Sequence, residues 1–189
     1  MKKVTNNILK GMASRFSATV MLLAMGCIAA FAQGNKLYIE DFDIAPGETK
    51  TLDIILENED PVSSLQFDIT FPTGLSYVEE SLERVTSRIT RTSHSIVAAK
   101  QGENVYRMGI LSTSSEMANS SVKGNNGTLL RITVTADNDY KGSFIYMAGI
   151  IGSNGTVSTT VRLDMPSLKV KANVHVGDLS NNLRKAKNS

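Results

Sequence analysis

Histidine has the widest chemistry of any side chain here, because imidazole serves both as a general base and as a zinc ligand. The chain has two, His94 and His175. Neither lies in the spacing of a zinc protease, and no Gly-x-Ser-x-Gly nucleophile elbow occurs. Ser120 and Lys123 match a Ser-x-x-Lys spacing, but a stretch of Ser, Asn and Gly surrounds them, so chance explains the match. We therefore predict that the protein has no catalytic residues and is not an enzyme.

Acidic residues are the second group that could do chemistry, as acid–base pairs or as calcium ligands. Glu79 and Glu80 are adjacent, and adjacent side chains point apart on a strand or helix, so we interpret them as solvated surface. The stretch 137–142 begins like a calcium loop but has Lys141 where an oxygen ligand is needed, so it predicts a β-turn. The stretch 178–189 lacks the glycine and the final acid of such a loop. We predict no metal site and no cofactor.

Aromatic rings are the third group, because they can stack on the faces of sugar rings. The sequence has no tryptophan, and its five tyrosines fall in different segments. Tyr106 and Tyr146 lie in expected strands, and they are the residues we expect to bind a glycan if the protein binds one. Half-buried packing is the alternative interpretation of each ring.

The stretch from 64 to 71 shows most clearly which element positions such side chains. Apolar and polar residues alternate strictly along it, with Leu65, Phe67, Ile69 and Phe71 between Ser64, Gln66, Asp68 and Thr70. Side chains of a strand point alternately to its two faces, so this pattern predicts one buried and one solvated face. We predict that Phe67 and Ile69 lie in a core and that Gln66 and Asp68 face solvent. Pro72 to Gly74 then predicts a turn.

Most other apolar stretches also resemble short strands, separated by turn-forming Gly, Pro, Asn and Asp residues. The sequence predicts a hairpin turn at 101–104, a turn at 152–155 and a long loop at 113–127. Apolar residues spaced by four, three and four predict one short helix around 79–84. About nine strands with almost no helix predict an all-β fold. We expect a two-sheet antiparallel β-sandwich of the jelly-roll type.

The N-terminal 32 residues predict a secretory signal peptide. A basic start precedes an apolar run from Phe16 to Ala29, and Ala30-Phe31-Ala32 forms a small-x-small cleavage site before Gln33. The run is shorter than the ~20 residues of a membrane span, so we expect no transmembrane span in the mature chain. Cys27 raises the alternative of a lipoprotein, but Ala24 replaces the large aliphatic residue expected three positions before it. We expect export without lipidation, with the secreted, periplasmic and cell-surface locations left open.

The mature chain differs in charge from the whole sequence. All 18 acidic residues but only 16 of the 20 basic ones follow residue 32, so the mature net charge is −2. This balance leaves no basic surface for nucleic acid, and we predict no nucleic-acid partner. The single cysteine lies in the signal peptide, so packing alone must stabilise the exported domain.

The order of these elements resembles the cohesin-like modules of secreted bacterial proteins. The resemblance covers residues 36–174 and lies in three motifs, which are the Ala-Pro-Gly-Glu turn at 45–48, the alternating stretch 65–71 with its Pro-Thr-Gly-Leu exit, and the later Gly-Thr-Leu-Leu-Arg-Ile-Thr-Val stretch at 127–134. Cohesins bind dockerins, which are small calcium-loaded modules on other secreted proteins. They share their fold with certain carbohydrate-binding modules. The resemblance therefore implies a cohesin-like β-sandwich at 33–174 and a non-catalytic binding function.

The resemblance also implies where a partner binds. In cohesins, Asn and Asp residues just before and within the strand that matches 65–71 contact the dockerin. Here the outward positions carry Ser64, Gln66, Asp68 and Thr70, which we expect to bind an extracellular dockerin-like protein in a polysaccharide-processing context. The alternative is a carbohydrate-binding module that recognises a polysaccharide. Residues 175–189 form a polar tail whose Val-Gly-Asp-Leu segment resembles the start of a dockerin.

Overall fold

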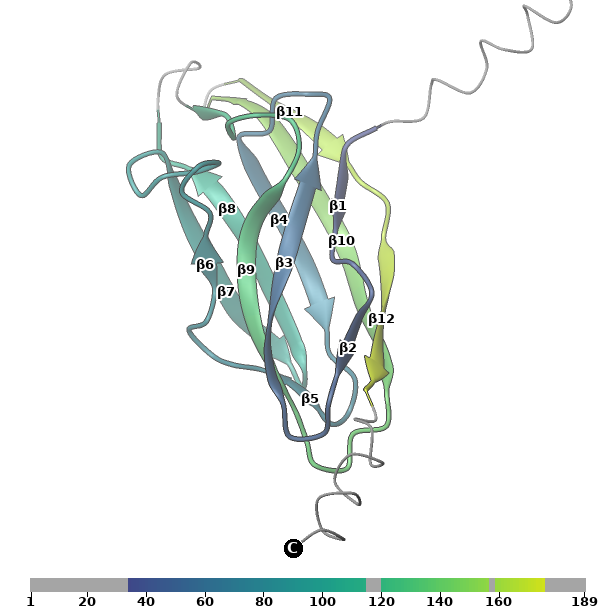
Figure 1. The fold of residues 1–189 in the computed structure, drawn as a ribbon. Coiled ribbons are helices and arrows are strands. Elements are labelled where there is room, and N and C mark those ends of the chain that lie inside the picture. The colour runs from purple at the N-terminus through teal and green to yellow at the C-terminus, as the bar shows by residue number, and fades with distance from the viewer. Residues whose placement is uncertain (1–33, 115–119, 157–158, 176–189) are drawn as a thin grey trace, which may run out of the picture. The chain divides into compact units, whose positions relative to one another are not determined.

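The computed structural model describes residues 34–114, 120–156 and 159–175, and these residues form an all-β sandwich of two sheets (Figure 1). The two-sheet fold predicted from the sequence is confirmed, although the described residues contain twelve strands where about nine were expected. The strands are β1 (Lys36–Tyr38), β2 (Phe42–Ile44), β3 (Thr49–Glu57), β4 (Ser64–Thr70), β5 (Leu75–Tyr77), β6 (Glu83–Arg84), β7 (His94–Gly102), β8 (Val105–Ser112), β9 (Thr128–Ala136), β10 (Ser143–Thr156), β11 (Thr159–Asp164) and β12 (Leu168–Val174).

The two sheets differ in size. The five-stranded sheet has the order β1-β3-β9-β5, and β6 also pairs with β9. The seven-stranded sheet has the order β2-β12-β10-β4-β8-β7, and β11 also pairs with β10. Neighbouring strands are antiparallel except β2 and β12, which run parallel. The first segment of the domain therefore contributes β1 to one sheet and β2 to the other.

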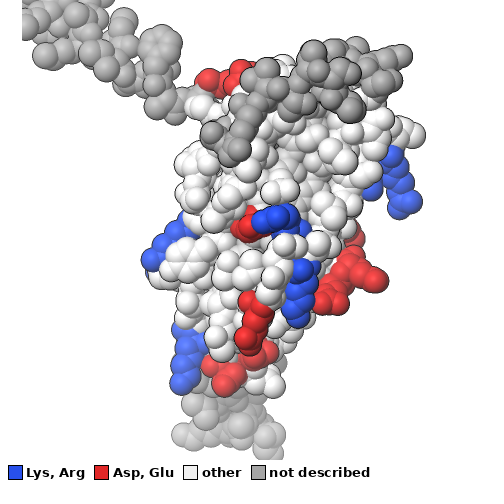
Figure 2. Space-filling view, turned by 180° about the vertical axis from the view of Figure 1, so that it is seen from behind, with Lys and Arg blue, Asp and Glu red and all other residues white. Residues whose placement is uncertain are grey.

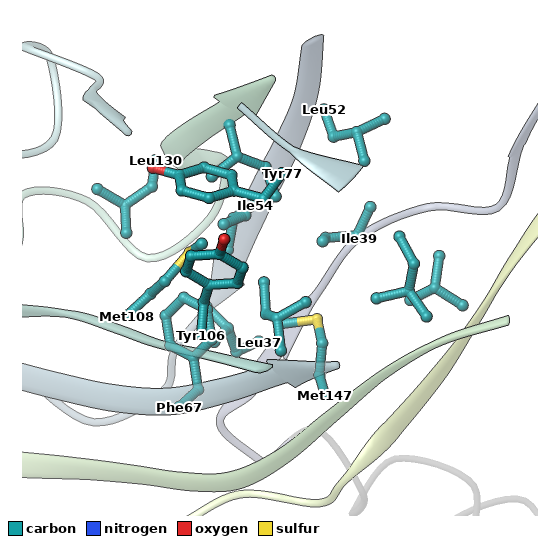
Figure 3. Close-up of a cluster of buried hydrophobic side chains, with 14 of the residues drawn as sticks. Leu37, Ile39, Leu52, Ile54, Phe67, Tyr77, Tyr106, Met108, Leu130 and Met147 are labelled. Atoms are coloured by element: carbon teal, nitrogen blue, oxygen red, sulfur yellow. The ribbon is translucent and has the colours of Figure 1, made fainter. Parts of the chain in front are cut away.

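The core lies between the sheets and follows the alternation read from the sequence. Phe67 and Ile69 of β4 are 0% exposed, as predicted, and Gln66 between them is exposed. Side chains from β3 and β9 of the other sheet meet them, and Figure 3 shows this contact between the two layers. Burying a large aliphatic or aromatic side chain contributes about 1.5–3 kcal/mol, so these facing rows dominate the stability of a domain without disulfides.

Three turns predicted from local sequence are present. The main-chain N–H of Leu75 donates to the carbonyl of Pro72 at 3.1 Å, and Gly74 has a φ of 83°, which a turn of type II requires at that position. A matching turn joins Ala45 to Glu48 at 3.0 Å. The stretch considered as a calcium loop is also a β-turn, because the N–H of Tyr140 donates to the Asp137 carbonyl at 3.1 Å.

Two local predictions were wrong, and long-range pairing explains both. Instead of a helix at 79–84, the chain forms a turn and then β6, because the Ser81 hydroxyl binds the main chain of Thr133 and β6 pairs with β9. Instead of turning at 152–155, β10 continues to Thr156, because Ile151 to Ser153 pair with the distant β4 before the strand forms a hairpin with β11. In both places tertiary hydrogen bonds outweigh the local preference of the sequence.

Candidate binding face

The four residues predicted to contact a partner lie on β4 at one face of the seven-stranded sheet. Ser64, Gln66 and Thr70 point away from the core, and so does the partly exposed Asp68. The register sets Gln66 beside Gly109 of β8 and beside Ile151 of β10. We call the outward surface of β7, β8, β4 and β10 the binding face, with its centre formed by Ser64, Gln66, Val97, Ala99, Arg107, Gly109, Leu111, Ile151 and Ser153.

The centre of the binding face is a shallow apolar hollow of about 380 Å³. It exists because Gly109 presents no side chain between Val97 on one side and Gln66 on the other. Val97 and Leu111 stand at its edge with 52% and 60% of their surface exposed. Figure 2, which views the seven-stranded sheet from outside, shows mostly uncharged residues over the upper part of the described surface, whereas most Lys, Arg, Asp and Glu residues lie below it and at its edges. Exposed aliphatic side chains around a hollow with polar neighbours are typical of a protein-binding surface.

Close contact between β4 and β8 makes glycine necessary at position 109. A Cβ atom added to Gly109 would lie 2.2 Å from the carbonyl oxygen of Leu65, far inside van der Waals contact. A side chain at this position would therefore separate the two strands. The hollow and the β4–β8 ladder thus depend on the same residue.

One ion pair borders the hollow. The Arg107 guanidinium donates from Nε to Asp68 Oδ1 at 2.8 Å and from Nη2 to Oδ2 at 3.0 Å, so the ion pair is bidentate. The hydrogen bonds from Arg107 hold the pKa of the Asp68 carboxyl below its usual value. Asp68 therefore stays ionised and fixed in position, and it gives the apolar centre a charged border.

The two tyrosines considered for glycan binding lie on opposite faces of the sheet. Tyr106 is opposite the inward-facing Ile69, is 9% exposed and has its ring centroid 4.8 Å from that of Tyr77. Tyr146 is opposite the outward-facing Thr70 and is 49% exposed. The structure therefore does not bring the two rings into one strip, and Tyr106 is mostly buried.

The sequence predicted the outward side of β4 but not the hollow beside it. Val97, Leu111 and Ile151 become neighbours only through strand pairing, so no local pattern shows them as one surface. One signal was present in the sequence, because a glycine inside an apolar strand such as Gly109 often marks close approach of another backbone. The uncharged outward positions of β7 were a second signal.

The buried titratable side chains of the described residues include Arg88 and His94. His94 is fully buried, its Nδ1 lies 2.9 Å from Ser93 Oγ, and burial lowers its pKa. Among the described residues no three His, Cys, Asp or Glu side chains are close enough to hold a metal ion. In the same part of the chain, no helix has the length and apolar character needed to cross a bilayer.

Comparison with known proteins finds similarity in structure but not in sequence. No protein-family model matches this sequence, and neither does any curated protein. The structure is similar to the seventh ScaB type I cohesin of Pseudobacteroides cellulosolvens, with a TM-score of 0.62, 13% identity, and 77% of this chain and 94% of that chain covered.

Two further similar structures come from other organisms. A type I cohesin–dockerin complex of Clostridium thermocellum gives a TM-score of 0.58 at 13% identity, covering 75% of this chain and 99% of that chain. A non-cellulosomal cohesin of the archaeon Archaeoglobus fulgidus gives 0.55 at 12% identity, covering 79% and 97%. The fold is a cohesin-like β-sandwich, as the motifs around the β4 strand implied.

Proposed function

We propose that this protein is an exported, non-catalytic binding module that captures another protein through the binding face. The observation that carries the proposal is the apolar hollow at Gly109, with the exposed Val97 and Leu111 at its edge and the Arg107–Asp68 ion pair beside it. Large exposed aliphatic side chains cost solubility, so their grouping around one hollow favours a partner that covers them.

The partner we propose is a dockerin-like module of another exported protein. Support comes from the fold, because several similar structures are cohesins solved in complex with dockerins. The geometry is consistent with it, since a flat sheet face with one hollow suits a helix that inserts a single aliphatic side chain above Gly109. A stable contact of this kind buries roughly 1,200–2,000 Å², more than the hollow alone provides. The interface would then extend along Ser64, Gln66, Asp68 and Thr70.

The test is capture of partners by the mature domain from secreted and envelope fractions, with mass spectrometry of what is bound. We expect a protein that contains a dockerin-like module, released when calcium is chelated. Gln66→Arg fills the hollow with a charged side chain and should abolish capture without lowering the melting temperature. Thr51→Arg, at an exposed position of β3 on the other sheet, is the matched control and should leave capture intact. Equal capture by both variants would refute the proposed surface.

Glycan binding is the second candidate, and one observation favours it. Tyr146 is half exposed on β10, and Phe144 precedes it by two residues on the same side of the strand. The Lys169 ammonium lies 3.8 Å from the Phe144 ring centroid and 5.7 Å from that of Tyr146. Affinity electrophoresis on plant and host polysaccharides decides this candidate. Retention that is lost in Tyr146→Ala but unchanged in Gln66→Arg would favour the glycan function over protein capture.

We also propose that the protein is exported by its N-terminal signal peptide, with cleavage after Ala32, and acts in polysaccharide processing outside the cytoplasm. The support is the basic start, apolar run and small-x-small site of the sequence. Residues 1–33, including Ala32, Gln33 and Cys27, lie outside the described residues, and so does the tail beyond 175.

A further inference from the structure

The other sheet covers the inner side of β7 only in part. Inward-facing residues of β4 and β8 are buried, as Phe67 and Met108 show. On β7 the inward positions are His94, Ile96, Ala98 and Lys100, which lie opposite inward residues of β8. Only His94 is buried, Ile96 is half-buried, and Ala98 and Lys100 are exposed.

Among the described residues, no strand pairs with β7 on its outer edge. Antiparallel strands alternate between residues that bond the neighbouring strand and residues that point away from it. The N–H of Thr113 donates to the Ser93 carbonyl, so the bonded residues of β7 continue from Ser93 in steps of two. His94 agrees with this, since its N–H donates to the Thr90 carbonyl and its carbonyl accepts from Arg84 Nη1 at 2.7 Å.

The same alternation directs the N–H and C=O groups of Ile96 and Ala98 away from β8. We find no other partner for these four groups in the described part of the chain. Edge strands with free main-chain groups usually carry a charge, a proline or a bulge that blocks pairing with another strand. The stretch 95–99 has none of these, because its residues are Ser, Ile, Val, Ala and Ala and its pairing with β8 shifts only after Lys100.

A groove runs along this edge, between β7 and the segment that follows β5. One part of it has a volume of about 370 Å³ and is lined by Tyr77, Glu79, Glu80, Leu82, Ile96, Ala98, Lys100 and Tyr106. A second part of about 450 Å³ adjoins the first at the apolar Leu82 and Ile96, and its remaining lining is polar, with Glu83, Arg84, Thr86 and Arg91. Both volumes exceed that of one side chain. The groove therefore offers two adjoining pockets beside a row of free main-chain groups.

We propose that this edge binds an extended peptide segment of a partner protein, which adds to the sheet as a strand next to β7. The main chain of the peptide bonds Ile96 and Ala98, and its inward side chains fill the two pockets. Glu79 and Glu80 face a single cation, Lys100, in the first pocket, so the inward residue there is basic. The inward residue near Leu82 and Ile96 is aliphatic. This site is separate from the hollow at Gly109 and does not depend on the proposed function.

The test uses a labelled peptide, Ac-Ser-Thr-Val-Thr-Lys-Thr-Ser-NH2, and a second peptide with Glu in place of Lys. We expect fluorescence anisotropy to give a Kd below about 1 mM for the first peptide and binding weaker by about threefold or more for the second. Hydrogen exchange should show new protection of the Ile96 and Ala98 amides. Absence of binding by both peptides, or a wild-type protein that dimerises through this edge in sedimentation, would overturn the proposal.

Two variants and one control make the result specific. Ala98→Pro removes an N–H that points away from β8, so the monomer keeps its β7–β8 ladder and melting temperature, and peptide binding weakens about tenfold. The double change Glu79→Lys with Glu80→Lys reverses the preference between the two peptides. Gln66→Arg on the binding face leaves peptide binding unchanged, which separates this site from the proposed function. Undiminished binding by Ala98→Pro, or loss of binding in Gln66→Arg, would show that the peptide lies elsewhere.

Discussion

Replacing Gly109 by alanine should destabilise the domain far more than the addition of one methyl group usually does. The new Cβ would lie 2.2 Å from the Leu65 carbonyl oxygen, whereas ordinary contacts at this kind of site are 3.4–4 Å. The obstacle is backbone, which cannot rotate away as a side chain can. Strands β4 and β8 must therefore separate locally by about 1 Å, which strains the ladder around Gly109 and Gln66.

The magnitude follows from what that separation breaks. Loss of about two main-chain hydrogen bonds costs roughly 0.5–1.5 kcal/mol each, and overpacking a tight contact costs about 1–3 kcal/mol. We expect Gly109→Ala to lower the free energy of unfolding by about 2–4 kcal/mol, a large part of the 5–15 kcal/mol typical of a domain. The hollow should be distorted as well, so partner capture should fall with stability.

Urea denaturation followed by circular dichroism measures this effect. Gly102→Ala is the matched control, because a Cβ there meets no atom within 4 Å and its φ is not in the left-handed region. That control should be neutral or stabilising by up to about 1 kcal/mol. A loss below about 0.5 kcal/mol in Gly109→Ala, with unchanged capture, would mean that β4 and β8 are not in close contact at this residue.

Further predictions concern the core, the ion pair, pH and processing. Phe67→Ala should cost about 3–5 kcal/mol in the same denaturation assay, as for other buried aromatic residues, and a smaller loss than in Asp68→Ala would reverse the face assignment. Asp68→Ala should cost only about 0–1 kcal/mol, because solvent screens its partly exposed ion pair. Burial lowers the pKa of His94, so stability should be complete above about pH 6.5 and fall as the pH drops below it, by at most about 1.4 kcal/mol per pH unit; His94→Gln should flatten this dependence in pH-resolved melting. Intact mass of the exported protein should show a chain that begins at Gln33, and a species that begins at a diacylated Cys27 would contradict the signal prediction.

The sequence predicted those parts of the fold that depend on neighbours along the chain. The alternation in β4 placed Phe67 and Ile69 in the core, and Gly74 marked the turn that follows. These two predictions are confirmed because side-chain direction in a strand and the φ preference of glycine are local properties. The helix predicted around 79–84 failed because the partner that decides its structure, Thr133 of β9, is distant in sequence.

The candidate site could also be predicted only in the part that depends on a single stretch of sequence. Its β4 row could be read from one stretch, so Ser64 and Gln66 appear where expected, although their binding role stays a prediction. The hollow could not, because it needs the register of three strand pairs that place Val97, Gly109 and Ile151 beside Gln66. The inward direction of Tyr106 could not be predicted for a similar reason, since it follows from the register of Tyr106 with Ile69.

The parallel pairing of β2 with β12 has a mechanical consequence. Phe42, Asp43 and Ile44 lie beside Ala172, Asn173 and Val174, and the N–H of His175 donates to the Ile44 carbonyl at 3.0 Å. Strand β2 lies near the N-terminal end of the described chain and β12 near its C-terminal end, and the two paired strands run in the same direction. Tension applied between the two chain ends therefore pulls them past each other. The hydrogen bonds then share the load and must break together, whereas strands pulled apart from one end would open one bond at a time. A module that holds a partner while its chain is under tension gains resistance to force from this arrangement, independently of its thermodynamic stability.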